Sequence, residues 1–368
     1  MNHKNSLKNL ACPNGDCPHF RKHGQGNIIR HSFYNTRQGR RRRYRCKDCG
    51  RTFSSTFGTA YYRLQSSRIC FDDVATMSVN GIGKSAISRI KRLSWNTVDR
   101  WLHQAFLHAQ NFNSTGLQGY EIVELQADEI CTFVDSKKRV TWLFTALEVS
   151  SRLWVGLAVG RRSYQNVERC LLNVLLRGRV YGRFLFTTDG LCLYRWAVER
   201  LMSGICIYGQ IVKTRRKERI VSVRRRIVCG TPSELDHALL HSEDSSKLNT
   251  SFVERHNLTI RQGSSYLCRR TACHAREERT LKEHLELLQL HYNFMRPHSA
   301  LRFGAEVRTP AMQAGLAVRK LSFREVFMMR VFFLLCVLAV LQVRIRDFIG
   351  RGVDLGSSRQ LVFRLNNT

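Results

Sequence analysis

The sequence predicts an α/β protein whose main body is a mixed sheet flanked by helices. Three observations predict this class. The chain has 368 residues, a length that suggests two or three domains. Its hydrophobic content of 43% can fill buried cores, which argues against a disordered basic chain. From residue 121 onwards, apolar runs of strand length alternate with patterns of helical period.

The charge indicates the class of binding partner, and the cysteine content indicates the cellular compartment. Sixty Lys and Arg against 28 Asp and Glu give a net charge of +32. This charge favours nucleic acid as the partner, with an anionic membrane surface as the alternative. The thirteen cysteines are an odd number, and the first residues form no apolar signal segment. We therefore expect free thiols in a reducing cytoplasm, at the nucleoid.

Residues 1–65 are predicted to form a zinc ribbon. Two cysteine pairs with 28 residues between them have the spacing of a site with four thiolates, formed by Cys12, Cys17, Cys46 and Cys49. Gly50 follows the second pair, where a tight turn favours a residue that tolerates positive φ. We expect one structural Zn²⁺ to supply folding energy here. His19 and His23 are alternative ligands, and four unrelated cysteines are the alternative to a site.

Two runs of consecutive arginines are candidate contacts for DNA phosphates. The first lies between the cysteine pairs and consists of Arg40, Arg41, Arg42 and Arg43. The second covers residues 224–226, within a basic, strand-like insertion at 215–227. If these arginines contact phosphates, the affinity for DNA should fall steeply with salt. The alternative is a solvated, disordered basic face.

Residues 66–115 are predicted to form a helix-turn-helix. Helices are expected at 71–80, 83–92 and 95–104, with Ser94 as the N-cap of the third. Asn96, Thr97 and Arg100 would face outward from that helix, as the side chains of a recognition helix do. The alternative is a helical hairpin that packs between two domains.

Residues 116–320 carry the strand and helix pattern of the main body. Strands are expected at 122–127, 140–147, 153–159, 184–188 and 205–212. Helices are expected at 164–176, from 190 through 202, at 232–240, 249–262 and 275–294. Three hairpin strands followed by alternating helices and strands are the order of the ribonuclease H-like fold.

Three acidic residues are candidate metal ligands. Asp128 is expected to end the first strand and Asp189 the fourth, and these strands are neighbours in that fold. Glu254 is the single acid on the basic helix 249–262. Glu129 and Asp135 compete with the first position. Glu243 and Asp244 compete with the third.

Carboxylates this close repel one another, so a divalent metal is expected between them. Mg²⁺ prefers oxygen ligands, and two such ions would activate a water or 3′-hydroxyl and stabilise the leaving oxygen of a phosphodiester. Arg261 lies two helical turns after Glu254 and could neutralise phosphate charge beside the site.

The chain resembles bacterial insertion-sequence transposases with a DDE catalytic domain, of the type with an N-terminal zinc ribbon and helix-turn-helix. The resemblance covers roughly residues 10–320. It is carried by the cysteine pairs and by residues 125–129, 186–190, 248–256, 291–301 and 308–312. It implies that Asp128, Asp189 and Glu254 are a catalytic metal-binding triad. It also implies a multimer that cleaves and transfers strands of double-stranded DNA at the inverted repeats of the element's ends.

Two other functions remain open: a non-catalytic DNA-binding regulator, and a structure-specific nuclease of the same fold. Residues 321–368 depart from the family pattern and are expected to be an appended apolar and basic tail. Its apolar run at 331–341 has eleven residues, whereas a membrane span needs about 20, so we expect no stable membrane association.

Overall fold

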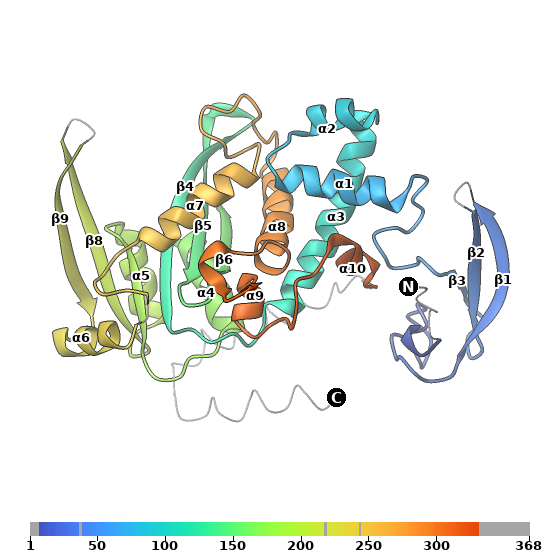
Figure 1. Ribbon diagram of the computed structural model, residues 1–368, viewed down its shortest axis with the longest axis horizontal. Coiled ribbons are helices and arrows are strands. Elements are labelled where there is room, and N and C mark those ends of the chain that lie inside the picture. Colours follow the sequence, from blue (N-terminus) through green and yellow to red (C-terminus); the bar gives the residue numbers. More distant parts are fainter. Residues whose placement is uncertain (1–6, 37–38, 217–218, 243, 331–368) are drawn as a thin grey trace. The chain divides into compact units, whose positions relative to one another are not determined.

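The computed structural model describes residues 7–36, 39–216, 219–242 and 244–330, and the chain divides into two compact units (Figure 1). Of the described residues, the first unit contains those up to Phe33 and Arg42–Ser55. The second contains those of Tyr34–Arg41 and Thr56–Arg330.

The first unit is built on a three-stranded sheet in the order β1-β2-β3. The strands are β1 (Ile28–Thr36), β2 (Gly39–Cys46) and β3 (Thr52–Ser54), preceded by the short helix η1 (Leu7–Asn9). The adjoining ends of β1 and β2, at residues 34–36 and 39–41, are grouped with the second unit. Among the described residues of this unit, the buried apolar side chains other than cysteines are Leu10, Ala11, Ile28, Tyr44 and Phe53. A core this small contributes little to the free energy of unfolding. A metal ion that cross-links the cysteines could supply the additional stability.

The second unit is organised around a six-stranded mixed sheet in the order β6-β5-β4-β7-β8-β9. Its strands are β4 (Glu124–Val134), β5 (Ser136–Glu148), β6 (Leu153–Gly160), β7 (Phe184–Asp189), β8 (Cys206–Arg216) and β9 (Arg219–Cys229). β7 runs parallel to both β4 and β8, and the other neighbours are antiparallel. The predicted mixed sheet is confirmed, as is the adjacency of its first and fourth strands.

The prediction that Asp128 ends its strand was wrong. β4 continues to Val134, because its antiparallel pairing with β5 extends past Asp128. Its parallel pairing with β7, by contrast, covers only Glu124–Ala127. Asp128 therefore lies at the point where β4 separates from β7, and the pair of acidic residues Asp128 and Glu129 marks this separation rather than a strand end.

Helices cover both faces of the sheet (Figure 1). α7 (Ser251–Gly263) packs on β4 and β5, and α8 (Glu278–Phe294) packs on β6. α4 (Tyr164–Arg177) packs on β5, β6 and α5 (Cys192–Leu201), on the opposite face. The smaller elements are α6 (Pro232–Leu240), η2 (Ser299–Leu301), β10 (Arg302–Phe303), β11 (Glu306–Val307) and α9 (Pro310–Gln313).

Three helices precede the sheet: α1 (Arg68–Val79), α2 (Lys84–Lys91) and α3 (Trp95–Gly116). Ser94 caps α3 as predicted, since its side chain accepts a hydrogen bond from the Thr97 backbone N–H. α3 is longer than the predicted 95–104, because Ala105, Phe106 and Ala109 are buried. The helix packs along α8, where the Asn113 amide donates to the Glu286 carbonyl at 2.9 Å.

The core of this unit extends past residue 320, where the sequence suggested that a tail begins. α10 (Phe323–Met328) packs against α1 and α3, and Phe323, Val326 and Phe327 are buried. The Phe327 ring makes an edge contact with Phe71, with centroids 5.4 Å apart. The apolar run at 331–341 lies outside the described residues. None of the helices in the described part of the chain is long and apolar enough to cross a membrane.

Replacing Phe327 with alanine tests whether α10 belongs to the core. Phe327→Ala should lower the free energy of unfolding by about 3–5 kcal/mol, because a fully buried aromatic ring is lost. Urea denaturation followed by circular dichroism measures this change. Val318→Ala, at a residue that is 98% exposed, is the control and should have little effect. Equal stability of the two variants would contradict the role of α10.

Candidate functional site

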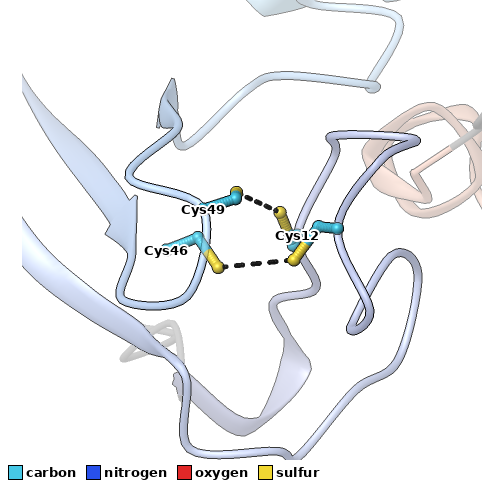
Figure 2. Close-up of side chains that lie close together, drawn as sticks. Cys12, Cys46 and Cys49 are labelled. Atoms are coloured by element: carbon cyan, nitrogen blue, oxygen red, sulfur yellow. Dashed lines mark hydrogen bonds between the residues drawn. The ribbon is translucent and has the colours of Figure 1, made fainter.

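The four predicted cysteines converge in the first unit (Figure 2). The Sγ atoms of Cys12 and Cys49 are 3.5 Å apart, and those of Cys17 and Cys46 are 3.9 Å apart. All four sulfurs lie within 4.8 Å of one another. Because Zn–S bonds are about 2.3 Å long, a tetrahedral zinc ion separates its sulfurs by about 3.8 Å, so this geometry fits such an ion.

The surroundings of the four sulfurs support a metal centre. Asn27 donates a hydrogen bond to the Cys46 sulfur at 3.3 Å, which favours a thiolate. Gly50 has a φ of +69°, as predicted for the turn after the second pair. Burial raises the pKa values of Cys12 and Cys17, whereas hydrogen bonds from the Arg51 backbone and neighbouring groups lower the pKa of Cys49 to about 7. His19 pairs with Asp48 at 2.8 Å, and neither His19 nor His23 is part of the cysteine cluster.

A cluster of three carboxylates lies where β4 separates from β7. Ligand atoms of Asp128, Glu129 and Asp189 are all within 4.8 Å of one another. Asp189 ends β7, and its Oδ1 accepts a hydrogen bond from the Leu191 backbone N–H at 3.0 Å. Oxygen ligands grouped in this way suit a hard divalent cation such as Mg²⁺. The competing residues Asp135 and Asp244 are not in the cluster, and Glu243 lies outside the described residues.

α7 is held over this cluster by side chains of the sheet. The Gln126 Oε1 accepts hydrogen bonds from the backbone N–H groups of Phe252 and Val253, at 3.2 and 3.1 Å. One turn further, the Asn257 amide donates to the Asp128 carboxylate at 2.8 Å and accepts from the Thr145 hydroxyl at 2.9 Å. Asn257 thus orients Asp128.

Sequence reasoning missed Asn257. The signal that could have found it is its spacing, because residues three apart on a helix lie on the same face, and Asn257 is three residues after Glu254.

Glu254 occupies the first turn of α7, near the cluster but not within it. Its carboxylate accepts a hydrogen bond from the Thr250 hydroxyl at 2.7 Å and pairs with Lys213 of β8. The structure therefore brings Asp128 and Asp189 together with Glu129, which had been only a competitor of Asp128. Membership of Glu254 in the metal-binding triad stays a prediction.

Burial and mutual repulsion raise the pKa values of the clustered acids. Burial, followed by the charges of Asp189 and Glu254, raises the pKa of Asp128 to about 6, against hydrogen bonds from the Glu129 backbone N–H and the Asn257 amide. Burial and the Asp189 charge raise the pKa of Glu129 to about 7, although its ion pair with Arg162 opposes this rise.

Two buried oxygen atoms beside the cluster lack hydrogen-bond partners in the described part of the chain. They are the Glu129 Oε2 and the Tyr194 hydroxyl. Burial and the charges of the clustered acids also raise the pKa of Tyr194 well above its ordinary value. An orphaned, buried carboxylate oxygen among like charges is unfavourable unless a cation neutralises it, so the cluster is chemically suited to a metal.

The predicted DNA contacts occupy varied environments. Asn96 and Arg100 are exposed on the first turns of α3, and the Thr97 hydroxyl bonds Ser94 at 2.8 Å. Arg261 is half-buried and donates to the Leu267 carbonyl at 3.0 Å. In the predicted arginine run, Arg40 and Arg43 are exposed, whereas Arg41 and Arg42 are half-buried. Contacts of all these residues with DNA stay predictions.

No protein-family model matches the chain, and no curated protein matches it in sequence. Among solved structures, the chain is similar to the piggyBac transposase in a cryo-EM synaptic complex with hairpin DNA. The TM-score is 0.33 and the sequence identity 11%, over 77% of this chain and 76% of that chain.

The raised pKa of Glu129 predicts a pH-dependent stability. Since the folded protein binds this proton more tightly than the unfolded chain does, the free energy of unfolding falls as pH rises from about 4.5 to about 7. Glu129→Gln removes this loss. Without added divalent cation, the free energy of unfolding of the variant should equal that of wild type near pH 4. Above pH 7 it should be larger than that of wild type by on the order of 1–3 kcal/mol.

Urea unfolding across this pH range measures the difference between the two proteins. Glu277→Gln, which removes a carboxylate that is 65% exposed, is the control and should leave the pH dependence unchanged. Parallel stability curves for wild type and Glu129→Gln would show that Glu129 titrates normally.

Proposed function

We propose that this protein is a DNA transposase that binds the terminal inverted repeats of its element and catalyses metal-dependent strand cleavage and strand transfer. The observation that carries the proposal is the convergence of Asp128, Glu129 and Asp189 beneath α7, the helix that bears Glu254. A non-catalytic DNA-binding regulator has no need of buried carboxylates at this point of the sheet.

The strand order and directions of the sheet support the proposal of a ribonuclease H-like catalytic domain. Three antiparallel strands, β6-β5-β4, continue into the parallel strands β7 and β8, so that the first and fourth strands are central neighbours. This is the arrangement for which acids on the first and fourth strands meet. The proposed domains are those expected from the sequence: a zinc ribbon at 1–65, a helix-turn-helix at 66–115 and the catalytic domain from 116.

In the proposed mechanism, Asp128, Asp189 and Glu254 would hold two Mg²⁺ ions. When bound, such a pair activates the attacking water or 3′-hydroxyl and stabilises the leaving oxygen. Asn257 keeps the Asp128 carboxylate oriented. Lys213 and Thr250 hold the Glu254 side chain at the edge of the cluster. Glu129, buried in the cluster, is the alternative third ligand.

DNA recognition is assigned to the two N-terminal modules. The exposed Asn96 and Arg100, with Thr97, would face the major groove from α3, and the run from Arg40 to Arg43 would contact phosphates. One Zn²⁺ on the four cysteines would stabilise the first unit. We further infer that the protein acts as a homo-oligomer on element ends and target DNA, in the cytoplasm at the nucleoid.

Substitution of the acids tests the catalytic proposal. Asp128→Asn should reduce Mg²⁺-dependent cleavage of duplexes carrying the terminal repeats by on the order of 100-fold or more, with DNA binding retained, because a metal ligand is lost. Glu254→Gln and Glu129→Gln, assayed in parallel, identify the third ligand by which of them abolishes cleavage. Asp135→Asn, whose side chain is 58% exposed at the end of β4, is the matched control.

Unchanged cleavage by Asp128→Asn would refute the active site. Pre-cut ends with free 3′-hydroxyls, supplied with a target plasmid, separate a transposase from a nuclease, since only a transposase joins the ends to the target.

Loss of one cysteine tests the zinc centre. Cys46→Ser should reduce bound zinc from one ion per chain towards none, measured by mass spectrometry of the metal, and abolish specific binding of the repeats. Cys268→Ser removes an exposed thiol outside the cluster and should retain the metal. Full zinc occupancy in Cys46→Ser would exclude the four-thiolate site.

A further inference from the structure

The β8–β9 hairpin extends beyond the sheet (Figure 1). β8 pairs with β7 only as far as Ile211, opposite Asp189, whereas its pairing with β9 continues to Arg216. We call residues 212–216 and 219–224 the arm. Five residues of antiparallel strand correspond to about 17 Å, so the arm reaches well past the neighbouring strand.

Most of the side chains that the structure describes in the arm are exposed. Its exposed members include Thr214, Arg216, Arg219, Ser222 and Arg224. The apolar side chains of Val221 and Val223 are also exposed, by 57% and 44%. A two-stranded ribbon is only marginally stable by itself, and most of the described side chains of the arm are exposed, so a bound partner would stabilise it.

The charge of the hairpin indicates the chemistry of that partner. Residues 212–226 contain eight Lys and Arg and one Glu. Such a density of like charge opposes self-association and favours a polyanion.

The base of the arm lies against the residues of the candidate active site. Lys213 pairs with Glu254 on α7. Val212 lies so close to Gly190, the residue after Asp189, that a Cβ added there would be 3.2 Å from its methyl group. A duplex with a phosphodiester at the acids would therefore pass the base of the arm.

The arginines of the hairpin whose side chains the structure describes divide into two groups. Arg225 donates to the Leu248 carbonyl at 2.9 Å, and Arg226 donates to the Gln210 Oε1 at 3.0 Å. The hydrogen bonds of these two arginines hold the base of the hairpin against the rest of the unit. Arg216, Arg219 and Arg224 extend from the arm into solvent. Arg225 and Arg226 are exposed as well, but each already donates to a protein oxygen, so we expect Arg216, Arg219 and Arg224 to be the main contacts for a partner.

We propose that the arm binds duplex DNA beside the phosphodiester that is held at the acids. The inference rests on the proposed function. A two-stranded ribbon fits the major groove, and the exposed guanidinium groups would contact the phosphates that line it. About 17 Å of duplex carries about 10 phosphates, enough to contact the exposed arginines of the arm.

Salt dependence of binding tests the proposal with the full chain. Fluorescence anisotropy of a labelled duplex is recorded over a range of salt concentrations without Mg²⁺, in the Asp128→Asn background so that no cleavage intervenes. Arg216→Gln/Arg224→Gln should weaken binding and reduce the slope of log K against log salt by about 1.8, since two phosphate contacts are lost. Arg216→Lys/Arg224→Lys should restore the slope.

A matched control distinguishes the loss of contacts made by the arm from the loss of two positive charges. Arg302→Gln/Lys320→Gln removes two exposed cations elsewhere in the unit and should leave the slope nearly unchanged. An unchanged slope in the arm variant, or an equal change in the control, would overturn the proposal. Loss of binding to anionic phospholipid vesicles with no loss for duplex DNA would also overturn it, in favour of a membrane surface.

Failure of the proposed function would look different. If wild type never cleaves DNA with Mg²⁺ but the arm variant still lowers the salt slope, the catalytic proposal falls and the DNA-binding arm stands. If wild type cleaves and the arm variant keeps its slope, only the arm is refuted. With a functional arm, the arm variant in the otherwise wild-type protein should cleave saturating DNA at the wild-type rate but need more DNA for half-maximal cleavage.

Discussion

The candidate active site depends on the hydrogen bonds that join the first turn of α7 to Gln126. The first backbone N–H groups of a helix have no partner within the helix. Here, two of them donate to a buried amide oxygen of the central strand. This contact fixes the residue at which α7 begins and its distance from the sheet. It therefore also places Glu254 beside the sheet and Asn257 against Asp128. The convergence of Asp128, Glu129 and Asp189 is set by β4 and β7, and α7 adds Glu254 and Asn257 to it.

A second constraint is the repulsion among the acids. Asp128, Glu129 and Asp189 lie close together and are partly buried, which raises the pKa values of Asp128 and Glu129. Basic side chains offset part of this repulsion: Arg162 pairs with Glu129, and Lys213 pairs with Glu254. A divalent cation would neutralise the remaining negative charge. The repulsion that destabilises the metal-free site therefore favours the binding of such a cation.

α8 integrates the second unit. On one side, the Asn113 amide of α3 bonds to its backbone, and on the other the amides of Gln289 and Asn293 donate to the Trp154 carbonyl of β6. Trp154 is fully buried and also packs on His256 of α7. The helices predicted to read DNA are therefore part of the same packed body as the sheet that carries the acids.

The sequence by itself determined the elements and the local sites. Apolar periodicity predicted the strands and helices of the sheet, and the spacing of Cys12, Cys17, Cys46 and Cys49 predicted their cluster, because both depend on neighbours along the chain. Tertiary structure alone decided where β4 leaves β7, that Glu129 joins the cluster, and that Asn257 orients Asp128. It also decided that α10 completes the core and that β8 and β9 extend past their neighbours. These features depend on how far each strand pairs and on which distant side chains meet, and neither is encoded in a local pattern.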